Sequence, residues 1–102
     1  MREFSAVTRK LARSCASTAM IYLMHVCGAQ AVAASGSPEK QRVMRAITSR
    51  NALATLAFSE RGSRSHFWAP VSRAVQNQGS SILNCDKSFV TSAGYADFYV
   101  VS

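Results

Sequence analysis

Between residues 15 and 34 the chain carries no charged side chain, and this stretch decides how much of the chain remains to fold. It follows a basic N-terminus, since residues 1–14 carry a net charge of +3. Its centre, 19–27, is strongly apolar, and overlapping Ala-x-Ala sites follow at 29–33. This order is that of a secretory signal peptide. The sequence therefore predicts that 1–34 is a signal peptide cleaved near Ala33, which leaves 35–102 as one mature domain.

Three other interpretations fit the same residues. An uncharged stretch of this length can cross a bilayer, so 15–34 could remain as a single-pass membrane anchor. The apolar and the basic side chains of 1–14 fall on different helical faces, which is typical of a mitochondrial transit peptide. The last interpretation is an ordinary core helix of a cytosolic protein, in which His25 is a core histidine with its polar atoms paired.

Large apolar side chains are scarce in this chain. Leu, Ile, Val and Phe together make up 22 of 102 residues, whereas Ala alone accounts for 16. Alanine buries little area, so it adds little of the roughly 25 cal/mol per Å² that apolar burial supplies. That gain must offset the entropy lost on ordering the chain. The sequence therefore predicts a marginal core, with part of the chain left disordered.

A basic amphipathic helix is predicted over 38–60. Ser37 can accept a hydrogen bond from an N–H group of the first turn, and Pro38 suits the first helical position. Apolar side chains between 43 and 58 recur with helical spacing, and Gly62 follows as a stop. Asn51 marks a potential break into two shorter helices.

The rest of the mature region predicts a shorter helix followed by strands. The second helix begins at Pro70 and ends at Gly79. Two β-like runs, 88–92 and 95–101, are separated by Ala-Gly and indicate a C-terminal hairpin. The predicted fold is thus a small α+β domain, helical over 37–79 and β-like over 80–102.

Basic charge is concentrated in the predicted helical part, with a net +5 over 35–73 and −1 over 74–102. Arginine forks onto phosphates and carboxylates, and aromatic rings can stack on bases. The candidate binding residues are therefore Arg42, Arg45, Arg61, Arg64 and Trp68. They predict contact with an anionic surface or a protein partner, and with nucleic acid as the alternative.

Sequence motifs for catalysis or metal binding are missing. There is no G-x-S-x-G, no H-E-x-x-H and no phosphate-binding loop, and His25 and His66 belong to no ligand cluster. We therefore predict no catalytic residue, no metal and no cofactor. Cleavage near Ala33 would leave Cys85 as a single cysteine, which predicts an intermolecular disulfide.

Taken together, these patterns predict a small exported protein without enzymatic activity. It would be secreted, periplasmic or held at the cell envelope, where it contacts its anionic or protein partner. One alternative is an organellar or cytosolic nucleic-acid-binding module that uses the arginines of 40–73. Another is a small membrane-anchored accessory subunit that keeps 15–34 in the bilayer.

Overall fold

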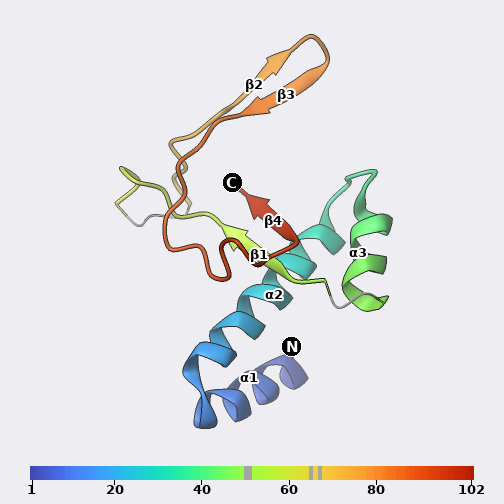
Figure 1. Cartoon of the computed structure of the whole chain (residues 1–102), viewed down its shortest axis with the longest axis vertical. Coiled ribbons are helices and arrows are strands. Elements are labelled where there is room, and N and C mark those ends of the chain that lie inside the picture. Colours follow the sequence, from blue (N-terminus) through green and yellow to red (C-terminus); the bar gives the residue numbers. More distant parts are fainter. Residues whose placement is uncertain (50–51, 65, 67) are drawn as a thin grey trace.

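Helices and short strands are mixed along the chain, which confirms the predicted α+β class (Figure 1). The computed structural model describes residues 1–49, 52–64, 66 and 68–102. Within these ranges the elements are α1 (Arg2–Ser14), α2 (Ala16–Ala34), α3 (Lys40–Ser49), β1 (Ala54–Ala57), β2 (Ala74–Asn77), β3 (Ser80–Leu83) and β4 (Phe98–Val101). The buried core is small, as the scarcity of large apolar side chains predicts.

The N-terminal region is a pair of helices that fold back on each other. The helix breaks at Cys15, whose backbone is extended, with φ −154° and ψ 109°. The Cys15 thiol accepts a hydrogen bond from the Thr18 N–H, 3.4 Å away, and so caps α2. The rings of Phe4 and Tyr22 lie 5.7 Å apart and join the two helices. The apolar face of α1 is therefore used for packing on α2.

The centre of the molecule is the contact between α2 and β1. Gly28 and Ala54 are buried, and Thr55 is completely so. The Ala54 N–H donates to Nδ1 of His25, 3.1 Å away, which gives this histidine a backbone partner. Helix α2 thus packs on β1 around His25 and Gly28, and its buried residues are Ala19 and Gly28.

Strands β1 and β4 pair in parallel, in a register that runs from Ala54 opposite Phe98 to Ala57 opposite Val101. A hydrogen bond just before the two strands holds their starts together: the Leu53 N–H donates to the Asp97 carboxylate at 2.8 Å. The Leu53 carbonyl in turn accepts from the N–H groups of Asp97 and Phe98. Segments far apart in the sequence are thereby joined beside α2.

The stretch that was expected to form the second helix, 70–79, forms part of a β-hairpin instead, so that prediction is wrong. Strands β2 and β3 are antiparallel, with Val75 opposite Ile82. Gln78 and Gly79 join them, with φ values of 46° and 84°. Positive φ at both turn residues matches the twist of a two-residue hairpin. Gly79 is therefore a residue of the hairpin turn and does not end a helix. The hairpin extends away from the body of the molecule (Figure 1).

The basic amphipathic helix is present, but it begins at Lys40 and not at Pro38, and it is shorter than predicted. The Ser37 hydroxyl accepts from the Glu39 N–H at 3.2 Å, as expected, in the turn just before the helix. The helix ends at Ser49, and Ala54–Ala57 is strand β1. The break expected at Asn51 lies outside the described residues. A short apolar run fits a buried strand as well as a helix, because it faces protein on both sides.

The predicted hairpin between 88–92 and 95–101 is also wrong. The chain turns at Ser92, whose φ is 61° and whose carbonyl accepts from the N–H groups of Tyr95 and Ala96. Strand β4 then pairs with β1 and not with its neighbour in sequence.

Candidate functional site: an apolar hollow beside the parallel strands

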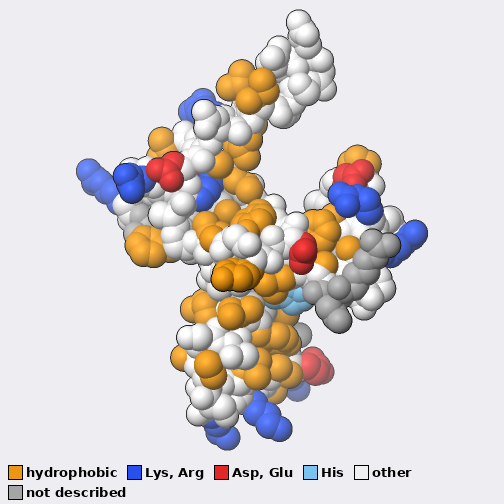
Figure 2. Space-filling model, viewed as in Figure 1, with side chains coloured by type: hydrophobic (Ala, Val, Ile, Leu, Met, Phe, Trp, Pro, Cys, Tyr) orange, Lys and Arg blue, Asp and Glu red, His pale blue; other side chains and the backbone are white. Residues whose placement is uncertain are grey.

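A hollow of about 460 Å³ opens where α2 meets the end of β1 and the segment that precedes β4. Pockets for small organic molecules in proteins measure roughly 300–1,000 Å³, so this hollow is large enough for one. In Figure 2 hydrophobic side chains gather over the centre of the molecule, whereas most Lys and Arg side chains lie at its periphery. The hollow is lined by Met20, Met24, Leu56, Phe58, Ser59, Phe89 and Thr91.

Helix α2 and strand β1 supply one wall through simple periodicity. Met20 and Met24 are four residues apart, so they lie one turn apart on the same face of α2. Leu56 and Phe58 are two residues apart along an extended segment, so both point to the same side. Methionine, leucine and phenylalanine make this wall apolar and, through the thioethers, adaptable.

The segment 89–91 supplies the other wall through Phe89 and Thr91. Phe89 is 93% exposed and has a φ of 53°, a conformation that L-residues rarely adopt. The Thr91 carbonyl accepts from the hydroxyl of the buried Thr55, with the oxygens 2.8 Å apart. Ser59 and Thr91 are the polar residues of the otherwise apolar lining. An apolar ring with a few polar edge atoms fits such a lining.

A buried ion pair joins the segments that follow β1 and precede Phe89. The Lys87 ammonium lies 2.5 Å from one Glu60 carboxylate oxygen, and both side chains are almost fully buried. The other carboxylate oxygen accepts from the N–H groups of Val71 and Ser72. Lys87, and then the hydrogen bonds from Ser72, lower the pKa of Glu60 to about 2 from its usual 4.5.

Acid is expected to destabilise the fold in a window set by Glu60. A carboxyl whose pKa is lowered on folding contributes stability above its unfolded pKa, and loses that contribution as the pH falls through its folded pKa. For Glu60 the contribution is complete above pH 4.5 and is lost between pH 4.5 and about 2.

Urea unfolding midpoints measured across this window should therefore fall more steeply for the wild type than for Glu60→Gln. Glu39→Gln is the control, because Glu39 is exposed and pairs with Arg42 on the surface. Parallel curves for the wild type and Glu60→Gln would show that the buried pair does not set the acid stability.

The candidate arginines are divided between two places. Arg42 and Arg45 line a groove of about 640 Å³ along α3, and Arg42 pairs with Glu39. Arg61 and Arg64 are exposed in the loop that follows β1. Figure 1 places this loop and α3 on opposite sides of the molecule. The structure therefore does not gather the four arginines on one surface.

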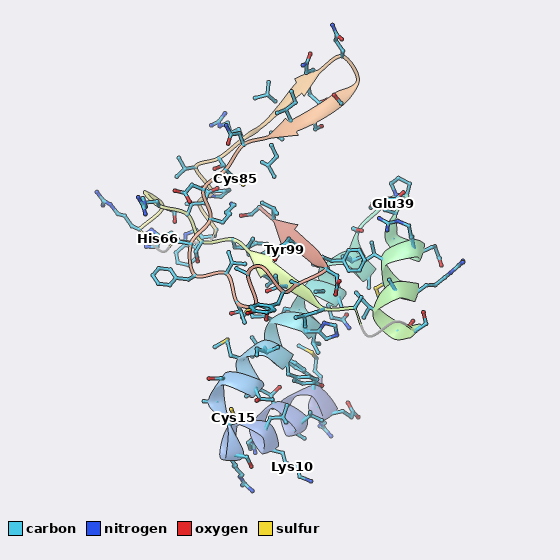
Figure 3. All side chains as sticks on the ribbon, viewed as in Figure 1. Lys10, Cys15, Glu39, His66, Cys85 and Tyr99 are labelled. Atoms are coloured by element: carbon cyan, nitrogen blue, oxygen red, sulfur yellow. The ribbon has the colours of Figure 1, made fainter. Side chains whose placement is uncertain are left out.

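Trp68 and the histidine beside it lie in the same loop as Arg61 and Arg64. The rings of Trp68 and His66 are 4.8 Å apart, although Trp68 is 68% exposed. Figure 3 shows His66 on this loop and Glu39 at the start of α3, far across the molecule. Contact of these residues with an anionic partner stays a prediction.

The cysteines are free thiols. Cys85 is half-buried and Cys15 is exposed at the junction of α1 and α2 (Figure 3). An intermolecular disulfide at Cys85 stays a prediction. Among the residues that the structure describes, no group of three or more His, Cys, Asp or Glu side chains could hold a metal ion.

The residues of the hollow were missed because they belong to three segments that the sequence assigned to different structures. Met20 and Met24 were assigned to the leader, and Leu56 and Phe58 to a helix. One available signal was the pair of runs Phe58-Ser-Glu60 and Lys87-Ser-Phe89. In each run a serine separates an aromatic residue from a charged one, and the two charges are opposite.

Two curated proteins resemble the chain over nearly its whole length. It is 34% identical over 97 residues to the cyclohex-1-ene-1-carbonyl-CoA dehydrogenase of Geobacter metallireducens, a match that covers 93% of this chain and 26% of that protein. It is 30% identical over 100 residues to the enzyme of the same name from Syntrophus aciditrophicus, covering 96% of this chain and 24% of that protein. The chain thus spans about a quarter of the length of these relatives.

The remaining comparisons are negative. No known protein family matches the chain. No solved structure matches it either.

The matches overturn the prediction of a protein without enzymatic activity, because both relatives are enzymes. As functions, the two alternatives, a nucleic-acid-binding module and an accessory subunit, fall with it, whereas the location of the protein stays a separate prediction. The prediction failed for a chemical reason. It searched for nucleophiles, paired carboxylates and metal ligands, and a segment of a dehydrogenase can contribute a binding surface without any of them.

Proposed function

We propose that this chain forms a ring-binding segment of a dehydrogenase that acts on a CoA thioester. The observation that carries the proposal is the match of nearly the whole chain, at 34% identity, to an enzyme of that activity. The apolar hollow supplies a place where such a segment could take part in the reaction.

The chemistry of dehydrogenation supports a ring as the occupant of the hollow. Removal of two hydrogens requires an acceptor of two electrons, and nicotinamide and flavin rings carry out hydride transfer in proteins. Phe58 and Phe89 offer aromatic contacts, Met20 and Met24 adaptable ones, and Ser59 a polar one. The occupant is the ring of the electron acceptor or the ring of the acyl group.

A CoA thioester also suits the charge of the chain. The formal net charge is +7, and CoA carries several phosphate charges. Arginine is the residue type best fitted to phosphate, because its guanidinium presents several donors in a rigid fork. We propose that the anionic partner expected from the composition is this part of the substrate.

Titration of the full chain with four compounds tests the proposal. They are riboflavin, nicotinamide mononucleotide, cyclohex-1-ene-1-carbonyl-CoA and free CoA as the control. At least one ring compound should bind and shift the backbone NMR signals of Phe58, Ser59 and Thr91, and free CoA should leave those signals unchanged. The responding compound identifies the occupant as acceptor or acyl ring. A folded chain that binds none of the ring compounds would refute the proposal.

Among the described residues, α2 is the helix that is both long enough and apolar enough to cross a membrane, and it lies near the N-terminus. We propose that it serves as a packing helix of the dehydrogenase, because it buries Gly28 against β1 and the relatives match 93% of the chain. Cleavage near Ala33 with export, and the single-pass and mitochondrial alternatives, stay predictions. Sequencing the N-terminus of the protein from fractionated cells tests them.

A further inference from the structure

The two walls of the hollow come from segments that are distant in sequence and joined by a compact polar junction. Glu60 directly follows Ser59 on one wall, and Lys87 lies two residues before Phe89 on the other. Glu60 and Lys87 form an isolated antiparallel bridge. Beside it the Ser88 N–H donates to the Ser59 carbonyl at 2.9 Å. Any movement of this junction would change the separation of the walls.

Each charged group of the junction also holds a further segment. Besides Lys87, the Glu60 carboxylate holds the N–H groups of Val71 and Ser72 at the end of the loop. The Lys87 ammonium donates to the Ser102 carbonyl, 2.6 Å away, just after the last strand. Four separate parts of the chain therefore meet at one ion pair.

The pair is placed to act on the hollow without touching its contents. Neither Glu60 nor Lys87 belongs to the lining of the hollow. Their side chains are 2% and 7% exposed, so both charges are almost fully removed from water. Burying such a pair gives little net stability compared with apolar residues of similar size. Its effect is on geometry, because hydrogen bonds from a buried charge fix the positions of the groups that it holds.

We propose that Glu60 and Lys87 are positioning residues, which set the separation of the two walls so that a ring fits between them. Lys87 fixes the segment that carries Phe89 and Thr91, and Glu60 fixes the segment that carries Phe58 and Ser59. The inference rests on the proposed function, since it names the residues that prepare the same hollow for its ligand.

Lys87→Met tests the inference, because methionine keeps an apolar stem and removes the ammonium. Arg42→Met is the matched control, since it breaks an exposed pair on α3. The first readout needs no ligand. Amide hydrogen exchange at 58–59 and 89–91 should quicken about tenfold in Lys87→Met, whereas exchange within α2 should stay at the wild-type rate.

The second readout is the dissociation constant of the ring compound that binds the wild type, taken from riboflavin, nicotinamide mononucleotide and cyclohex-1-ene-1-carbonyl-CoA. It should rise about tenfold in Lys87→Met and stay unchanged in Arg42→Met. Glu60→Gln keeps the acceptor oxygen for Val71 and Ser72 and loses the charge. It should give an intermediate rise, and it replaces Lys87→Met if that variant does not fold.

The outcomes separate the two proposals. Unchanged exchange at 89–91 in a folded variant overturns the positioning role, whether or not a ring binds. An unchanged dissociation constant in that variant also overturns it. Quickened exchange in a chain whose wild type binds no ring compound overturns the proposed function and, with it, a role in ring binding, and shows only that the ion pair holds the two segments together.

Discussion

Replacing Gly28 by valine is expected to lower the free energy of unfolding by about 1–3 kcal/mol, which is the usual penalty for overpacking a close contact. A Cβ atom at Gly28 would lie 3.2 Å from both the Ala54 Cβ and the Thr55 nitrogen. Two of the three nearest atoms belong to the β1 backbone, which cannot rotate away as a flexible side chain can. Helix α2 would have to move off the strand, and the buried surface of Ala54 and Thr55 would open.

Gly36→Val is the control for this change, because a Cβ atom at Gly36 meets no atom within 4 Å. Urea denaturation of the two variants and the wild type gives the comparison. Valine is a better helix former than glycine, so helix propensity alone would make Gly28→Val more stable. A loss of stability therefore reports the close contact between α2 and β1. A Gly28→Val chain as stable as the wild type would mean that α2 does not pack on β1.

Replacing Met20 by tryptophan is expected to weaken binding of the ring compound about tenfold or more, equivalent to about 1.4 kcal/mol. Met20 lines the hollow from α2 and is 48% exposed, so the larger side chain can be accommodated without disturbing the core. The indole would occupy volume that the ligand needs. The dissociation constant is measured by titration of the folded variant.

Ile21→Trp is the matched control, because Ile21 is the next residue of α2, is 42% exposed and does not line the hollow. It should bind the ring compound with the wild-type dissociation constant. If both variants bind as the wild type does, the ligand occupies another surface. If both lose binding equally, the effect comes from α2 as a whole and not from the hollow.

Local chemistry made part of this fold predictable. The Ser37 cap was expected from a polar side chain before Pro38, and its hydroxyl accepts the Glu39 N–H. A strand was expected within 95–101, and β4 (Phe98–Val101) lies there. Both features depend on residues that lie close together in sequence.

Long-range pairing accounts for what could not be predicted. The sequence around β1 does not show that its partner is β4, since the parallel register depends on contacts such as that of Leu53 with Asp97. Gly79 ends a helix as readily as it forms a hairpin turn, and only the pairing of Val75 with Ile82 decides. Patterns of a few residues are ambiguous wherever the partner is distant.

The candidate site escaped prediction for the same reason. Met20, Leu56 and Phe89 are common core residues, and nothing in their types indicates a ligand. They become a site only when α2, β1 and the segment before β4 come together. The binding prediction named arginines because charge can be read from a sequence. An apolar hollow forms only when distant segments come together in the fold.

A chimeric enzyme that carries this chain in place of its matched segment tests the central claim most directly. The stretch of the Geobacter metallireducens enzyme that matches this chain would be replaced by residues 1–102, and oxidation of cyclohex-1-ene-1-carbonyl-CoA by the purified chimera would be measured. We expect a folded chimera that oxidises the thioester, and lower activity when it carries Met20→Trp. A folded chimera without measurable turnover would contradict the proposal that this chain is a segment of a dehydrogenase.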